Sequence, residues 1–107
     1  MNYLSLKAHS RVYQFALEDI YYIKTIKEHK IEVVTIDWSY SFSSISLTEI
    51  ELEVPQLFRC HRNCLVNIHQ INMVDKKTRF IYFRHPDVLP IICARARLKS
   101  LLALLRR

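Results

Sequence analysis

The residues best suited to chemistry lie close together near the middle of the chain, in the segment Phe58–Asn67, which holds two cysteines, a histidine and two arginines. Cysteine and histidine can bind zinc, but structural zinc sites usually combine two closely spaced ligand pairs. Only Cys93 lies outside this segment, so a second cysteine pair is missing. Cys60 beside His61 could form a nucleophile and its base, but neighbouring residues on a strand point to opposite faces. We therefore expect no metal site, no cofactor and no catalysis.

The three cysteines, Cys60, Cys64 and Cys93, form an odd set without a paired framework. Such a set is typical of reduced thiols in a cytoplasmic protein. Nearby arginines could lower the pKa of Cys60 and make it a redox switch. The expectation that we favour is a buried, inert thiol.

Composition favours a polyanionic partner and excludes several classes of enzyme. The chain has 107 residues, half of them hydrophobic, and a formal net charge of +6. An excess of basic residues suits nucleic acid, although many small basic domains bind nothing anionic. The chain has no glycine, which excludes phosphate-binding loops, dinucleotide fingerprints and nucleophile elbows. Tight turns must instead place Asn, Asp, Ser, His or Lys at positive φ.

Length and hydropathy predict a single cytoplasmic domain over residues 1–107. No apolar run reaches the roughly 20 residues that span a bilayer, and the N-terminus has neither the apolar stretch nor the cleavage site of a signal peptide. We expect no membrane partner and no small-molecule substrate.

The hydrophobic pattern predicts a mostly β fold with two short helices and antiparallel pairing. Ser46 and Glu49 form a capping box that starts a helix, and Pro55 ends it. A second helix is expected over residues 94–107, with Leu98, Leu101, Leu102 and Leu105 on one face. Strands are expected at residues 3–7, 12–17, 20–26, 31–36, 40–42, 71–74, 79–83 and 89–92.

Two polar residues of the central segment have structural roles as their favoured interpretation. His61 lies among apolar neighbours, so we expect a buried ring that hydrogen-bonds to backbone. Asn67 precedes residues 68–70, and its side chain is expected to cap that turn.

The central segment also resembles a family signature. Phe58-Arg59-Cys60-His61-Arg62, followed by Leu65-Val66-Asn67, is similar to the signature of LytTR DNA-binding domains: an aromatic residue, Arg, any residue, His, two variable polar positions, a hydrophobic stretch and Asn. Residues 19–23 and 71–75 resemble the strands on either side. The resemblance extends from about residue 19 to 99. It is nearest to cytoplasmic response regulators that serve peptide quorum sensing in Gram-positive bacteria.

The resemblance implies a fold and a function. LytTR domains are elongated assemblies of small antiparallel β-sheets with short helices. They are the output domains of transcription regulators and bind double-stranded DNA sequence-specifically, with loop side chains in successive major grooves of paired repeats. Two copies usually act together, so a homodimer on DNA is expected. The receiver domain of a full response regulator is not part of these 107 residues.

The resemblance also assigns residues. Three connectors match the DNA-contacting loops of the family, and they place His29, Arg62 and Arg95 at bases. The family often has a polar residue such as Asn where Arg62 stands; an arginine would favour guanine, because it donates to both O6 and N7. Asn63 is an alternative base contact, suited to adenine. Phosphate contacts, which give affinity without sequence choice, are expected from Lys27, Lys30, Arg59 and Arg97.

Two rival functions use other surfaces. A protein-interaction module would dock through the leucine-rich C-terminal helix or a strand edge. An RNA-binding module would stack bases on Tyr21, Tyr22 and Phe83. The DNA hypothesis requires that the three connectors meet on one surface.

Overall fold

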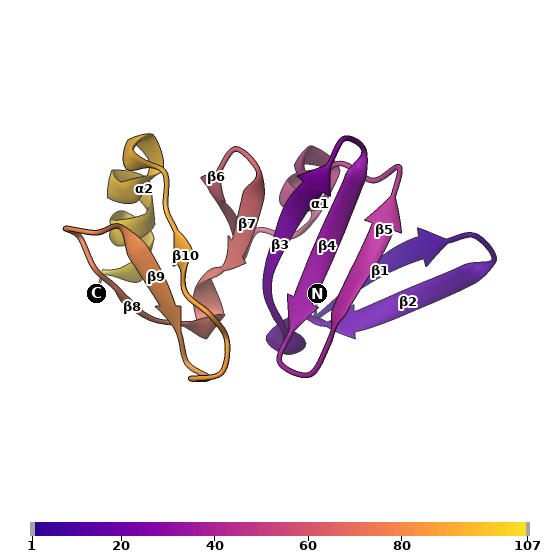
Figure 1. Ribbon diagram of the computed structural model, residues 1–107, viewed down its shortest axis with the longest axis horizontal. Helices are drawn as coiled ribbons and strands as arrows, with labels where there is room; N and C mark the ends of the chain where they lie inside the picture. The colour runs from indigo at the N-terminus through magenta and orange to yellow at the C-terminus, as the bar shows by residue number, and fades with distance from the viewer. Residues whose placement is uncertain (1, 107) are drawn as a thin grey trace.

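The computed structural model describes residues 2–106 and shows an elongated molecule, 44 × 25 × 24 Å, built mostly from antiparallel strands (Figure 1). Strands β1 (Tyr3–Ala8) and β2 (Arg11–Ala16) form a hairpin at one end. The central sheet has the order β5-β4-β3-β7-β6 and comprises β3 (Ile20–Lys27), β4 (Lys30–Thr35), β5 (Ser39–Ser43), β6 (Leu57–His61) and β7 (Cys64–Asn67).

The other end of the molecule holds a three-stranded sheet of order β10-β9-β8 and the longer helix. Its elements are β8 (Ile71–Val74), β9 (Phe80–Phe83), β10 (Ile91–Ile92) and α2 (Arg95–Leu105). Helix α1 (Leu47–Glu53) connects β5 to β6, and two 3₁₀ turns, η1 (Leu17–Asp19) and η2 (Ile68–Gln70), precede β3 and β8. The predicted fold class, mostly β with two helices and antiparallel sheets, is confirmed.

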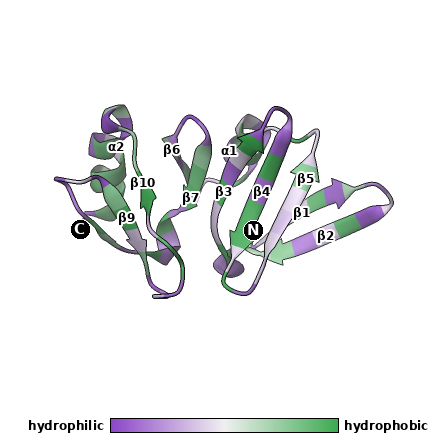
Figure 2. Ribbon diagram, viewed as in Figure 1, coloured by the Kyte–Doolittle hydropathy of each residue, from purple (hydrophilic) through white to green (hydrophobic). Residues whose placement is uncertain are grey.

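The central sheet is covered on both faces at β3 and β7, where successive residues point to opposite sides and pack against different elements. Ile23 on β3 pairs with Leu65 on β7, and both belong to a core shared with β1, β2 and α1. The next pair, Tyr22 with Val66, contributes to a second core that includes β8, β9 and α2. Strands β3 and β7 therefore separate two hydrophobic cores, while hydrophilic residues concentrate in the turns (Figure 2).

The second core contains the aromatic residues on which the rival RNA-binding function depends. Tyr21 is 8% exposed and Phe83 is 5% exposed, and their rings pack edge to face with centroids 5.7 Å apart. Tyr22 is half-buried and stacks on Phe83. These rings pack in or against the core, which leaves little ring surface on which a base could stack, so the rival RNA-binding function loses its support.

Strands β6 and β7 are the elements that the sequence pattern did not predict. Arg59 and His61 place polar side chains within β6, and a bulge between their positions interrupts the register with β7. Phe58 and Cys60 alternate with Arg59 and His61 as on a strand with one buried face, but the run is short, and its thiol and basic side chains favoured its interpretation as a site. At the other end, β10 is shorter than the predicted strand 89–92, because Pro90 has no amide hydrogen to donate.

Side-chain caps fix the ends of the short elements as expected. The Glu49 amide donates to Ser46 Oγ (3.2 Å) and the Ser46 amide to Glu49 Oε1 (3.4 Å), which completes the capping box. Asn67 is fully buried; its Oδ1 accepts from the His69 amide, and its Nδ2 donates to the carbonyls of Leu17 and Ile20. The predicted cap at residues 68–70 is confirmed, and Asn67 also joins η1 to the central sheet.

Among residues 2–106, four adopt positive φ: His9, His29, Ser44 and Arg79. Histidine and serine were expected there in a chain without glycine, but Arg79 was not. The Arg79 guanidinium donates to the Cys93 carbonyl at 2.9 Å, and this bond helps to maintain its backbone conformation.

Helix α2 covers the second core with the predicted leucines. Leu101 is fully buried, Leu98, Leu102 and Leu105 are half-buried, and Leu104 is 53% exposed. In residues 2–106 no helix has both the length and the apolar character that a membrane crossing requires.

Candidate nucleic-acid interface

Three connectors lie along one edge of the molecule: the turn after strand β3, the turn after strand β6 and the start of helix α2. Strands β3, β5 and β6 each pair antiparallel with β4 or β7, so these three strands run in the same direction. The turns after β3 and β6 therefore lie at the same edge, about two strand spacings or roughly 10 Å apart. Helix α2 also begins at this edge (Figure 1), because the Ala94 amide donates to the Cys60 carbonyl near the end of β6. We call residues 27–30 the His29 turn and residues 61–64 the Arg62 turn.

The His29 turn presents an exposed imidazole. His29 has φ 59°, its side chain is 83% exposed, and its Nε2 lies 3.9 Å from the carboxylate of Glu28. The His29 carbonyl accepts a hydrogen bond from the Ser44 amide at 2.7 Å, which joins this turn to the start of the α1 connector. Lys27 and Lys30 face each other across the turn.

Three hydrogen bonds hold the backbone of the Arg62 turn. Its Asn63 carbonyl accepts from the Thr25 amide (2.9 Å), and the Asn63 amide donates to Nδ1 of His61 (3.2 Å). The Arg62 carbonyl accepts from Nη1 of Arg59 (2.7 Å). The side chains of Arg62 and Asn63 are exposed. His61 hydrogen-bonds to backbone as predicted, but its ring is half-buried because it lies at the strand end, where the core stops.

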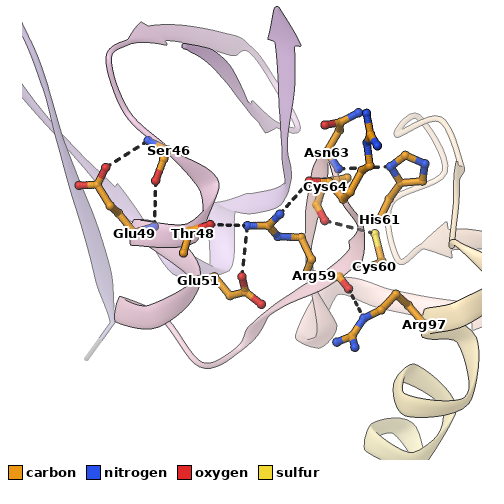
Figure 3. A network of polar contacts seen from close by, with 11 residues as sticks. Ser46, Thr48, Glu49, Glu51, Arg59, Cys60, His61, Asn63, Cys64 and Arg97 are labelled. Carbon is orange, nitrogen blue, oxygen red and sulfur yellow. Dashed lines mark hydrogen bonds and ion pairs between the residues drawn. The ribbon is translucent and has the colours of Figure 1, made fainter. Parts of the chain in front are cut away.

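Arg59 connects this turn to helix α1 (Figure 3). Its Nη2 donates to Thr48 Oγ1 at 3.1 Å and lies 3.2 Å from Glu51 Oε1, and its side chain is 21% exposed. Both Nη atoms of Arg59 therefore already have partners within the domain. Its phosphate contact stays a prediction.

The start of α2 carries two arginines in different environments. Arg95 is exposed and makes no side-chain hydrogen bond or ion pair within residues 2–106. Arg97 is half-buried: its Nε donates to the Arg59 carbonyl (2.9 Å), and its guanidinium carbon lies 4.8 Å from the centre of the Phe58 ring. The same edge thus offers one unengaged arginine and one that fixes α2 to β6.

A surface hollow of about 450 Å³ lies between the two turns and the start of α1. His29 and Lys30 line one side, Arg59 and Arg62 line another, and residues 44–49 complete the wall. Two of the three predicted base-contacting side chains therefore border one concave surface.

Comparison with known proteins identifies the family. The family model of the LytTr DNA-binding domain matches residues 10–106. The chain belongs to the LytTR family. Among solved structures, it is similar to the LytTr DNA-binding domain of a protein from Bacillus cereus described as a methyl-accepting/DNA response regulator, with 20% sequence identity and a TM-score of 0.70. That alignment covers 95% of this chain and 97% of the other. The comparison with curated proteins gave no match.

Within this LytTR domain, the edge combines the predicted residues with some that sequence reasoning missed. The base-contact candidates His29, Arg62, Asn63 and Arg95 all have exposed side chains there, beside Lys27 and Lys30. Thr48, Glu51 and Ser44 were missed. Thr48 and Glu51 are three residues apart on α1, a spacing that places both on one helix face, and this was the signal that could have revealed a shared partner.

The three cysteines of the LytTR domain lie on the elements that form this edge: Cys60 on β6, Cys64 on β7 and Cys93 just before α2. Cys60 and Cys93 are fully buried and Cys64 is half-buried, and none of them forms a disulfide. Hydrogen bonding to Cys64, together with burial, raises the pKa of the Cys60 thiol, and the opposing effect of Arg97 is smaller. Burial raises the pKa of Cys93 to about 11. The expected burial of Cys60 is confirmed, and its thiolate, the reactive form, is disfavoured. Residues 2–106 contain no cluster of three or more potential metal ligands.

Proposed function

We propose that this LytTR domain binds double-stranded DNA sequence-specifically as the output domain of a transcription regulator. In this proposal His29, Arg62 and Arg95 contact base edges from three connectors, with Asn63 as an alternative at the Arg62 turn. Lys27, Lys30 and Arg97 contact phosphates. The observation that carries the proposal is the position of the three connectors along one edge, with the side chains of His29, Arg62 and Arg95 exposed.

The dimensions and charge of the molecule support this mode of binding. The long axis of 44 Å exceeds the roughly 34 Å helical repeat of B-DNA, so one domain can extend past a full turn of duplex. The net charge of +6 favours association with phosphate. Two copies on paired repeats would each use this edge, and a regulator of the quorum-sensing branch, located in the cytoplasm, is the biological setting that we predict.

The rival function as a protein-interaction module has less support. Leu98, Leu101 and Leu105 pack on the domain's own second core, and Leu102 is half-buried, which leaves Leu104 as the exposed leucine of α2. One exposed leucine is an ordinary surface feature and does not indicate an interface.

The test begins with selection of duplexes from a randomised library by the wild-type chain. Anisotropy titrations then compare a selected duplex with a shuffled duplex of the same composition. The variant His29→Ala/Arg62→Ala/Arg95→Ala is expected to lose the preference for the selected duplex while it retains salt-dependent binding to both. A wild-type chain that selects no sequence, or that binds a protein partner independently of salt and no duplex, would overturn the proposal.

A further inference from the structure

One residue, Arg59, contacts every element of the DNA-facing edge except the His29 turn, through its side chain or its backbone carbonyl. The guanidinium of Arg59 donates to the Arg62 carbonyl and to Thr48 Oγ1, and it lies 3.2 Å from the carboxylate of Glu51. Its backbone carbonyl accepts from Arg97 on α2. Arg59 thus links α1, the Arg62 turn and α2 (Figure 3).

We infer that Arg59 is a positioning residue for the Arg62 turn and that Glu51 maintains its orientation. This inference rests on the proposed function, since it explains how the backbone of a base-contacting turn is fixed. Discrimination by an arginine depends on donation to two acceptors of one guanine, and such a geometry tolerates displacements of only about 0.5 Å. A bond to the Arg62 carbonyl fixes the backbone from which that side chain extends.

The surroundings of Arg59 favour this role over a phosphate contact. Its side chain is 21% exposed and both Nη atoms have partners. Its Nε is buried without a hydrogen-bond partner among the residues that the structure describes, and leaving a buried donor unpaired costs stability. A phosphate would also have to approach the carboxylate of Glu51, which it repels.

The substitution Glu51→Gln separates two explanations, because they predict opposite changes in DNA affinity. If this edge attracts DNA through net charge alone, Glu51→Gln removes a repulsive charge and strengthens binding to every duplex. If Glu51 orients Arg59, the same change weakens binding to the selected duplex, although the domain becomes more positive. Glu53 is the matched control, because it lies on the same helix, is exposed and forms no ion pair within residues 2–106.

The experiment measures the ratio of affinities for the selected and shuffled duplexes by anisotropy titration of the 107-residue chain. We expect Glu51→Gln to lower this ratio about 3-fold, as suits a partly exposed ion pair, and Glu53→Gln to leave it unchanged. Equal ratios for the two variants would overturn the inference. Circular dichroism melting shows whether each variant is folded.

Arg59→Lys separates positioning from phosphate contact. Lysine keeps the charge but cannot donate in fixed directions to Thr48, Glu51 and the Arg62 carbonyl together. We expect the ratio to fall about 10-fold, with little change in binding to the shuffled duplex or in the salt dependence. Equal losses on both duplexes, with a shallower salt dependence, would assign Arg59 to phosphate and overturn the inference.

The proposed function and the inference about Arg59 are refuted by different results. A wild-type chain without sequence preference refutes the proposed function and the inference with it. A wild-type chain that discriminates, and loses discrimination in Arg62→Ala but not in Glu51→Gln or Arg59→Lys, refutes the inference alone. Backbone order parameters of the free domain give a DNA-independent readout, in which Glu51→Gln but not Glu53→Gln should lower the order at residues 62 and 63.

Discussion

The His29 turn and the Arg62 turn lie at the same edge of the same sheet but are fixed in different ways. The backbone of the Arg62 turn is bonded by two side chains, Arg59 and His61, and by the Thr25 amide. The His29 turn is joined to its surroundings through a backbone bond from Ser44, and its imidazole has only a 3.9 Å approach to Glu28.

This difference predicts that the two turns contribute unequally to sequence discrimination. A side chain that extends from a fixed backbone loses less freedom on binding and rejects a wrong base more strongly than one whose backbone has fewer hydrogen bonds. We therefore expect the Arg62 turn to dominate sequence choice and the His29 turn to contribute a smaller, more tolerant contact.

The largest effect is expected from Arg62→Ala. Loss of the guanidinium should weaken binding to the selected duplex by about 1–3 kcal/mol and relax specificity at one base pair. Titration against duplexes that carry each of the four base pairs at every position would locate this effect. If Arg62→Ala weakens selected and shuffled duplexes equally, Arg62 contacts phosphate, and the proposed contrast between the turns fails.

A smaller effect is expected from His29→Gly. Loss of the imidazole should weaken binding to the selected duplex by about 1 kcal/mol. Glycine at φ 59° relieves the left-handed strain, so the free energy of unfolding should rise by about 0.5 kcal/mol.

Ser44→Gly is the matched control for His29→Gly, since Ser44 has φ 63° beside the same turn. It should give the same stabilisation by urea unfolding without the loss of DNA affinity. A His29→Gly variant that binds as tightly as Ser44→Gly would show that the imidazole contacts no base.

Lys30→Gln should give a smaller change that is uniform across sequences. A phosphate contact adds about one unit to the slope of log affinity against log salt, so this variant should bind selected and shuffled duplexes equally less well, with a slope shallower by about one. Lys7→Gln, on the exposed face of β1 in the hairpin at the far end of the molecule, is the control. A change in sequence preference for Lys30→Gln would instead make Lys30 a base contact.

Burial of the Cys93 thiol should make the domain less stable at alkaline pH, with no effect at neutral pH. Because the pKa of Cys93 is raised to about 11 from an ordinary 9.0, the folded state prefers the neutral thiol. The stability that this provides is complete below pH 9 and is lost as the pH rises through about 11.

Cys93→Ala tests this alkaline effect directly. The variant should show a smaller fall in melting temperature between pH 9 and 11 than the wild type does, while other groups titrate equally in both. Identical falls for the two proteins would mean that the thiol is not the group responsible.

Much of the fold could be predicted because local patterns and global packing agree. The capping box at Ser46 and the cap at Asn67 use bonds between residues two or three apart, so sequence spacing identifies them. The strands of the β1–β2 and β3–β4 hairpins were predicted nearly to the residue, because β1 alternates regularly and β3 is rich in β-branched and aromatic residues. Strands β6 and β7 were missed because they have only five and four residues, and because β7 pairs with β3, about 40 residues earlier in the chain, a contact that local spacing does not show.

The amino-acid sequence by itself determined the family, the fold class and the types of residue that could face DNA, because these depend on short-range spacing, hydrophobic periodicity and total charge. Only the tertiary structure decided that Glu51 and Thr48 reach Arg59, and that Arg97 engages its carbonyl while Arg95 is left exposed. Those contacts join residues 8 to 38 positions apart, and such distant groups meet only when the packing of two cores brings α1, β6 and α2 to one edge.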